Sequence, residues 1–249
     1  MEEFIGERSM MKLDVLAIGA HPDDVELSCG GTIIRIIKDG YRVGVLDITQ
    51  GELGTRGNAK IRALEAAHAA AIMGVEVREN LGIPDGNIEP SMKNRLKLVK
   101  VIRRYRPDIL LFPYREDRHP DHERTHTLCR EAWFAAGLEK VVTRSSGKRQ
   151  KAFRPRAYYH YMQWLEFVPS FVVDVTAEYE QRMEAMQAYR SQFHNPSSSE
   201  PETILTTTDF QDMVTTRLKY YGDRIGKKYG EAFLSPAPLR IDDILALNR

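Results

Sequence analysis

The chain has 249 residues, a formal net charge of +1 and 42% hydrophobic residues. This length suffices for one large domain or two small ones, and the near-neutral charge gives no general attraction to nucleic acid or to a membrane surface. No apolar run approaches the roughly 20 residues that span a bilayer. The two cysteines, Cys29 and Cys129, are too few for a disulfide framework and indicate a reducing compartment such as the cytoplasm.

Residues 1–10 lack the apolar segment of a secretory signal, so we expect a flexible N-terminal extension followed by a single domain over 11–249. The first half of that domain alternates apolar runs with helical patterns. The expected strands are 13–20, 43–48, 75–77 and 109–112, and the expected helices are 32–38, 59–73, 94–105 and 120–136. Strands separated by helices predict right-handed crossovers and a mostly parallel sheet flanked by helices, which is an α/β fold.

The second half of the chain is less regular and predicts a C-terminal α/β elaboration of the same domain. A basic loop is expected over 143–151 and a long turn over 195–201. The expected strands here are 157–162 and 171–175, and the expected helices are 177–193 and 209–228.

Two similar tetrapeptides each follow an expected buried strand: His21-Pro22-Asp23-Asp24 and His119-Pro120-Asp121-His122. Proline disfavours the helical conformation in the residue before it, which keeps both leading histidines extended. Pro120 suits the first position of the helix expected over 120–136. Because ligand sites in open parallel sheets form outside the carboxyl ends of the strands, we expect these two corners to share one site.

Three of these side chains match the ligand count of a catalytic zinc site, which uses three protein ligands and one open position. They are His21, Asp24 and His122. Such a metal lowers the pKa of bound water to about 7, which points to a hydrolase. Asp23 could then accept the proton of the water, and His119 could stabilise an oxyanion and protonate a departing amine. A His₂Asp set also accepts Fe²⁺ or Co²⁺, so the metal stays open at this point.

Several nearby residues favour simpler interpretations. Asp121 is interpreted as a charge at a helix N-terminus and Cys29 as a packing residue. Glu26 either orients His21 or is a charge near the loop. No G-x-G-x-x-G follows the first expected strand, which argues against dinucleotide binding.

The segment Ala20-His21-Pro22-Asp23-Asp24-Val25-Glu26 and the later His119-Pro120-Asp121-His122 resemble the signatures of the LmbE-like, or PIG-L, zinc deacetylases. This resemblance implies a Rossmann-like fold. It also implies zinc on His21, Asp24 and His122, with Asp23 as general base and His119 as the second catalytic group.

Further segments resemble one branch of that family, the N-acetylglucosaminyl-malate deacetylases of bacillithiol biosynthesis. These segments are 51–57, 116–119, 159–161, 188–193 and 229–233. The branch implies removal of acetyl from a malate glycoside of N-acetylglucosamine, whose carboxylates call for cationic partners. Arg118 and Arg62 are the implied partners, and Arg56 and Glu52 lie in a loop that could reach the sugar.

Some members of the family use a tyrosine to hold the oxyanion, whereas Phe210 corresponds to that position here, which leaves part of the stabilisation unassigned. Members commonly form trimers or hexamers, so a homo-oligomer is expected. Two alternatives stay open: a deacetylase of another N-acetylglucosamine conjugate or of a mercapturate, and a non-catalytic metal- or sugar-binding module. The presence of both Asp23 and His119 argues against the second.

Overall fold

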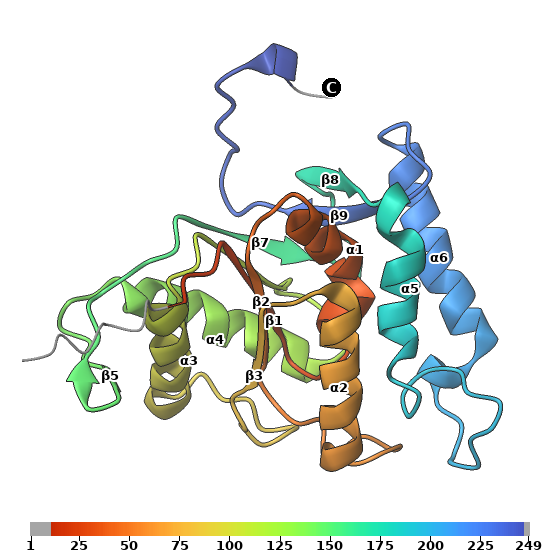
Figure 1. The fold of residues 1–249 in the computed structure, drawn as a ribbon, viewed down its shortest axis with the longest axis horizontal. Helices are drawn as coiled ribbons and strands as arrows, with labels where there is room; N and C mark the ends of the chain where they lie inside the picture. Colours follow the sequence, from red (N-terminus) through yellow and green to blue (C-terminus); the bar gives the residue numbers. More distant parts are fainter. Residues whose placement is uncertain (1–10, 247–249) are drawn as a thin grey trace, which may run out of the picture.

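The structure is a computed structural model that describes residues 11–246; the extension expected over 1–10 lies outside the described residues. A seven-stranded sheet forms the centre (Figure 1). From edge to edge its strands are β3 (Val77–Asn80), β2 (Val43–Asp47), β1 (Val15–Gly19), β4 (Ile109–Pro113), β7 (Ala157–Tyr161), β9 (Gly230–Leu234) and β8 (Phe171–Asp174). The first five are parallel and β9 is antiparallel to both neighbours. The predicted α/β fold with a mostly parallel sheet is confirmed.

Helices cover both faces of this sheet. They are α1 (Asp24–Lys38), α2 (Ala59–Met73), α3 (Met92–Tyr105), α4 (Pro120–Ala136), α5 (Tyr179–Gln187) and α6 (Thr208–Asp223). In β1, Leu16 and Ile18 pack with α3 and α4, whereas Val15 and Ala17 pack with α1 on the opposite face. This two-residue alternation divides the core into two layers. Figure 1 shows α2, α5 and α6 on the same side as α1. Across residues 11–246, no helix combines the length and apolar character of a membrane span.

Two helices begin and end where the sequence predicts, because their N-termini are capped locally. The Asn58 side chain accepts hydrogen bonds from the backbone N–H groups of Lys60 and Ile61 at the start of α2. At the start of α4, His119 is the N-cap residue and Pro120 occupies the first turn. Both loops that carry the tetrapeptides therefore lead directly into a helix.

Helix α1 begins at Asp24, eight residues earlier than expected. The helix runs through Gly30 and Gly31 with a kink at Cys29 (φ −146°, ψ 21°). The Glu231 carboxylate on β9 accepts hydrogen bonds from the backbone N–H groups of Gly31 at 3.0 Å and Thr32 at 2.7 Å. A partner about 200 residues away thus satisfies donors that the kink leaves free.

The C-terminal half departs more from expectation. Strands 157–162 and 171–175 are confirmed, but β9 was not expected and lies between them. Strand β3 begins and ends later than the expected strand 75–77. The basic loop contains an unexpected hairpin of β5 (Arg144–Ser145) and β6 (Lys148–Arg149). Three short 3-10 helices were also not expected: Thr176–Glu178, Ile204–Thr206 and Ile244–Ala246. Helices α5 and α6 end earlier than predicted, and α6 stops at Asp223 so that the chain can return as β9.

Candidate active site

The two tetrapeptides meet where β1 and β4 leave the sheet, as the sequence predicts. Asp23 precedes α1 with a φ of 118°, a left-handed conformation that is uncommon for a residue other than glycine. Residues held in such conformations cluster at functional sites. The first corner is therefore a fixed and strained turn beside the expected metal ligands.

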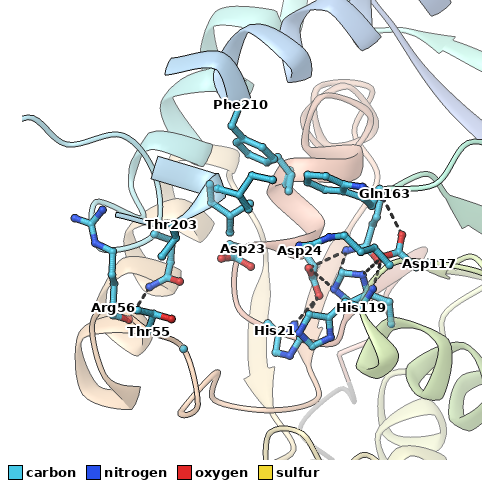
Figure 2. A pocket seen from close by; sticks show the side chains of 18 of the residues that line it. His21, Asp23, Asp24, Thr55, Arg56, Asp117, His119, Gln163, Thr203 and Phe210 are labelled. Carbon is cyan, nitrogen blue, oxygen red and sulfur yellow. Dashed lines mark hydrogen bonds and ion pairs between the residues drawn. The ribbon is translucent and has the colours of Figure 1, made fainter. Parts of the chain in front are cut away.

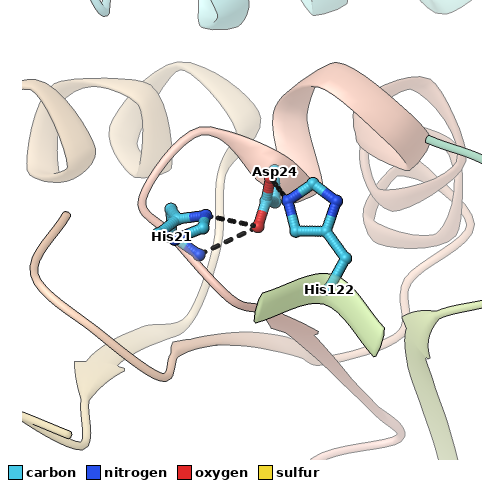
Figure 3. A group of neighbouring side chains, drawn as sticks. All are labelled: His21, Asp24 and His122. Atoms are coloured by element: carbon cyan, nitrogen blue, oxygen red, sulfur yellow. Dashed lines mark hydrogen bonds and ion pairs between the residues drawn. The ribbon is translucent and has the colours of Figure 1, made fainter. Parts of the chain in front are cut away.

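His21, Asp24 and His122 offer one ligand atom each, and these atoms lie within 4.8 Å of one another (Figure 3). Asp24 Oδ1 is 3.2 Å from His122 Nε2, and Asp24 Oδ2 is 3.6 Å from His21 Nδ1. His21 is 8% exposed and Asp24 is 4% exposed. Two imidazole nitrogens and a carboxylate oxygen are a donor set that suits a divalent transition metal.

The electrostatics of this group favour a bound cation. Burial lowers the pKa of His122, but the Asp24 carboxylate outweighs it and raises that pKa to about 9. Burial raises the pKa of Asp24, yet His122 and His21 hold it well below its usual range. The carboxylate is therefore ionised in a buried place where positive charge is stabilised, which fits a divalent metal such as Zn²⁺.

Carboxylates outside this group fix the orientation of both imidazoles. His21 Nε2 lies 3.0 Å from Asp85 Oδ1 and 3.6 Å from Asp121 Oδ2. His122 Nδ1 lies 2.9 Å from Asp117 Oδ1. Each histidine thus directs one nitrogen to a carboxylate and leaves the other for a metal, an arrangement that sets the tautomer and strengthens the ligand.

Sequence reasoning missed Asp85 and Asp117 and assigned Asp121 only a helix-terminal charge. Two signals could have found the first pair. Asp85 follows β3, so it lies at the same edge of the parallel sheet as the expected metal ligands. Asp117 precedes His119 by two residues in the loop that leaves β4.

The alternative that Glu26 orients His21 is wrong. Glu26 is fully buried and forms an ion pair with Arg78 on β3. It also accepts a hydrogen bond of 3.0 Å from the Tyr189 hydroxyl. This carboxylate connects α1 to the sheet and to the segment after α5, and so it supports the loop that carries the ligands from behind.

Asp23 faces the cavity and pairs with Arg62 of α2. Arg62 Nη2 lies 2.9 Å from Asp23 Oδ2, and the same guanidinium also donates to the carbonyl oxygens of Pro22 and Gly51. Burial raises the pKa of Asp23 to about 7, and Arg62 acts in the opposite direction. A carboxylate with a pKa near neutrality is suited to general-base chemistry. Of the Arg62 nitrogens, Nε is buried and has no hydrogen-bond partner among the described residues.

His119 lies against both histidines of the metal-binding group. Its ring centroid is 4.8 Å from that of His21 and 5.0 Å from that of His122. Its Nδ1 accepts a hydrogen bond of 3.2 Å from the Asp121 backbone N–H, so the proton of the neutral ring is on Nε2. Burial, with the adjacent imidazoles, lowers the pKa of His119. The resting ring is therefore neutral, and its Nε2–H is the hydrogen-bond donor that it can offer to a bound ligand.

A cavity of about 350 Å³ opens over these groups (Figure 2). Arg118 lines it with its guanidinium carbon 4.3 Å from the centre of the Trp164 ring. Arg56 lines the cavity at the end away from Asp117 and Gln163 in Figure 2 and is 4% exposed, with Nε and Nη2 free of hydrogen-bond partners in the described part of the chain. Its nearest carboxylate is that of Glu200, at 3.6 Å.

Glu52 and Phe210 were both expected near the substrate, but only Phe210 lines the cavity. Glu52 is not among the residues that line the cavity; its carboxylate accepts hydrogen bonds from the backbone N–H groups of Gln50 and Asp85, so it shapes the loop behind His21. Phe210 does line the cavity, where its ring stacks parallel to that of Trp164 at 6.2 Å. A phenyl ring offers no hydrogen-bond donor.

The chain is similar to several known proteins. Residues 16–133 match the profile of the PIG-L family, described as GlcNAc-PI de-N-acetylase. A diacetylchitobiose deacetylase from Thermococcus kodakarensis is 30% identical over 87% of this chain and 80% of its own length. A probable N-acetyl-alpha-D-glucosaminyl L-malate deacetylase 2 from Bacillus anthracis is 28% identical over 72% of this chain and 81% of its own length.

Solved structures show the same relationship. The crystal structure of the conserved protein TT1542 from Thermus thermophilus has a TM-score of 0.82 and 37% identity, and the match covers 92% of this chain and 97% of that one. The chain therefore belongs to the PIG-L, or LmbE-like, deacetylase family and is a hydrolytic N-deacetylase.

Proposed function

We propose that the chain is a zinc-dependent deacetylase that hydrolyses the N-acetyl group of N-acetylglucosaminyl-malate, as in bacillithiol biosynthesis. One observation carries the choice of substrate. Arg118 lines the cavity next to the metal-binding group and forms no salt bridge with any residue of 11–246. A cation placed there calls for an anionic substrate.

His21, Asp24 and His122 would hold the zinc, which supplies Lewis-acid activation of water when bound. Asp23 takes the proton from the attacking water, and its buried position next to Arg62 keeps the carboxylate in place. His119 protonates the sugar nitrogen as the C–N bond breaks, which releases acetate and the free amine.

The malate recognition rests on the guanidinium of Arg118. Its stacking on Trp164 orients the planar fork, which matches a carboxylate with two parallel hydrogen bonds. Arg56 and Arg62 line the cavity, and we propose them as further polar contacts to the sugar or its second carboxylate. We propose that Glu52 acts indirectly, because its carboxylate holds the loop that carries Asp85.

A second candidate substrate is an uncharged N-acetylglucosamine conjugate such as diacetylchitobiose. It is favoured by the Thermococcus relative, which is more similar and covers more of this chain than the Bacillus one. The apolar part of the cavity wall, with Trp164, Phe210 and Met213, would suit the second sugar ring.

Three further predictions concern the protein as a whole. We predict a cytoplasmic location and assembly into a trimer or hexamer. We also predict that Fe²⁺ or Co²⁺ can replace Zn²⁺.

The test compares acetate release by zinc-loaded protein from the malate glycoside, the methyl glycoside and diacetylchitobiose. We expect kcat/KM for the malate glycoside to be at least about tenfold higher, because a charged hydrogen bond contributes about 1.5–3 kcal/mol. Arg118→Gln should abolish this preference. The matched control is Arg115→Gln, which removes an exposed arginine three residues away that pairs with Glu116.

Equal or faster turnover of diacetylchitobiose, unaffected by Arg118→Gln, would establish the second candidate instead. Release of no acetate from any of the three compounds at full zinc occupancy would contradict both candidates.

A further inference from the structure

Gln163 is a polar residue next to the metal-binding group for which the chemistry above has no role. It follows β7, is 6% exposed and lines the cavity. Its Nε2 donates a hydrogen bond of 2.8 Å to Asp24 Oδ1 and lies 3.4 Å from His122 Nε2 (Figure 2). The side-chain amide thus contacts two of the three residues that would hold the metal.

The orientation of this amide is fixed by its surroundings. The amide nitrogen faces Asp24, since a carbonyl oxygen in that place would face a negative oxygen. Arg217 of α6 donates a hydrogen bond to the Gln163 backbone oxygen, and the next backbone N–H, that of Trp164, donates to Asp117 Oδ2 at 2.8 Å. The backbone around Gln163 is therefore held from both sides.

One N–H of the amide is available for a ligand. The first N–H is used by Asp24. Asp24 Oδ1 and His122 Nε2 are only 3.2 Å apart and lie on the same side of the amide nitrogen, so the second N–H points away from both of them. This second N–H is therefore free to donate to a ligand in the cavity that Gln163 lines.

The other end of the amide shows that Gln163 is not there for packing alone. Its Oε1 is buried and has no hydrogen-bond partner among the described residues. An unsatisfied buried acceptor costs about 1–3 kcal/mol. An apolar side chain of the same size would avoid this cost, so a residue kept only for packing would not need the amide.

We propose that Gln163 donates a hydrogen bond to the oxyanion of the tetrahedral intermediate. This inference rests on the deacetylase function proposed above. As Asp23 takes the proton of the attacking water and the new C–O bond forms, the π electrons of the acetamide move to its oxygen. The free N–H of Gln163 stabilises that charge. The oxygen then re-forms the carbonyl as the C–N bond breaks and His119 protonates the nitrogen. Phe210, which also lines the cavity, offers no donor for this task.

The test uses Gln163→Met, which keeps the length of the side chain and removes both N–H groups. Three quantities are measured: Zn²⁺ affinity by chelator competition, kcat and KM on the best substrate, and binding of a phosphonate analogue of the tetrahedral intermediate. We expect kcat and analogue affinity to fall together by about 10²–10³, as for the loss of one oxyanion donor. KM and Zn²⁺ affinity should change less than about threefold.

Met162→Leu is the matched control, because it alters the buried neighbouring side chain and should leave all three quantities unchanged. Gln163→Leu, which also removes both N–H groups and adds no charge next to Asp24, provides a second variant if the first does not fold, and should lose analogue affinity equally. A fall in kcat that follows lost Zn²⁺, with unchanged analogue affinity at zinc saturation, would overturn the proposal and leave Gln163 as a support of Asp24. Analogue binding is measured without turnover, so it reads out even if the wild-type protein releases no acetate.

Discussion

Arg62 Nη2 lies 2.9 Å from Asp23 Oδ2, and both side chains are buried at the floor of the cavity. The same guanidinium binds the carbonyl oxygens of Pro22 and Gly51, so it connects the first tetrapeptide to the glycine-rich loop. Burial is the largest cause that raises the pKa of Asp23, and the positive charge of Arg62 is the largest that opposes it and keeps the carboxylate ionised.

Replacement of Arg62 should therefore change the pH dependence of the reaction. Asp23 acts only when it is ionised, so activity falls as the pH drops through its pKa. Arg62→Gln removes a charge that lowers this pKa, and the acidic limb of the kcat/KM profile should move to higher pH by about one unit or more. An acidic limb at the wild-type position would show that Asp23 is not the titrating base.

Asp23→Asn tests the base itself and keeps the backbone of the turn. Asparagine tolerates a positive φ better than most residues, so it suits the φ of 118° found here. Turnover should fall by about 10²–10⁴ while bound zinc per chain stays constant. Acetate release and metal analysis measure the two quantities, with Asp39→Asn at the exposed end of α1 as control. Wild-type turnover in Asp23→Asn would remove Asp23 from the mechanism.

Metal affinity should depend on a carboxylate that is not itself a ligand. Asp85 lies 3.0 Å from His21 Nε2 and fixes the nitrogen that remains for the metal. Asp85→Asn should weaken Zn²⁺ binding about 10–100-fold. Chelator competition measures this, and Asp108→Asn, which alters a partly exposed carboxylate paired with Lys12, serves as the control. If both variants bind zinc as tightly as the wild type, Asp85 does not orient His21.

The parts of the fold that local signals determine were predictable from the sequence. The buried runs that form β1, β2 and β4 and the capped start of α2 were found because their determinants lie within a few residues. The start of α1 was not, since the kink at Cys29 is stabilised by Glu231 from the far end of the chain. Strand β9 was missed for a related reason: it begins with Gly230 and Glu231 instead of a continuous apolar run, and it is ordered by the two strands between which it inserts.

The residues of the site can likewise be separated into those that local motifs predict and those that depend on distant parts of the chain. His21, Asp24 and His122 were predicted to share one site because two motifs followed two neighbouring parallel strands. Gln163 was missed because a lone Gln in a loop has no distinguishing pattern, and Asp117 was missed although it precedes His119 by only two residues. Their importance arises only when the loops after β4 and β7 fold against each other and direct these side chains at the metal-binding group.

A pair of histidines outside the metal site should make the fold sensitive to acid. The Nδ1 atoms of His160 and His126 both lie within hydrogen-bond distance of the Pro113 carbonyl oxygen, at 3.1 and 3.2 Å, and their ring centroids are 4.8 Å apart. Burial, followed by the neighbouring His126, lowers the pKa of His160 from 6.5 to about 4. The folded state thus requires a neutral ring.

Protonation of His160 therefore favours unfolding. Its contribution to stability is fully present above pH 6.5, the unfolded value, and is lost as the pH falls from 6.5 towards 4, by up to about 3 kcal/mol. Urea unfolding at several pH values should show a shallower loss over this window in His160→Phe than in the wild type. His68→Gln, at an exposed position of α2, should follow the wild-type curve. Identical slopes in His160→Phe and the wild type would mean that His160 does not titrate between the folded and unfolded states.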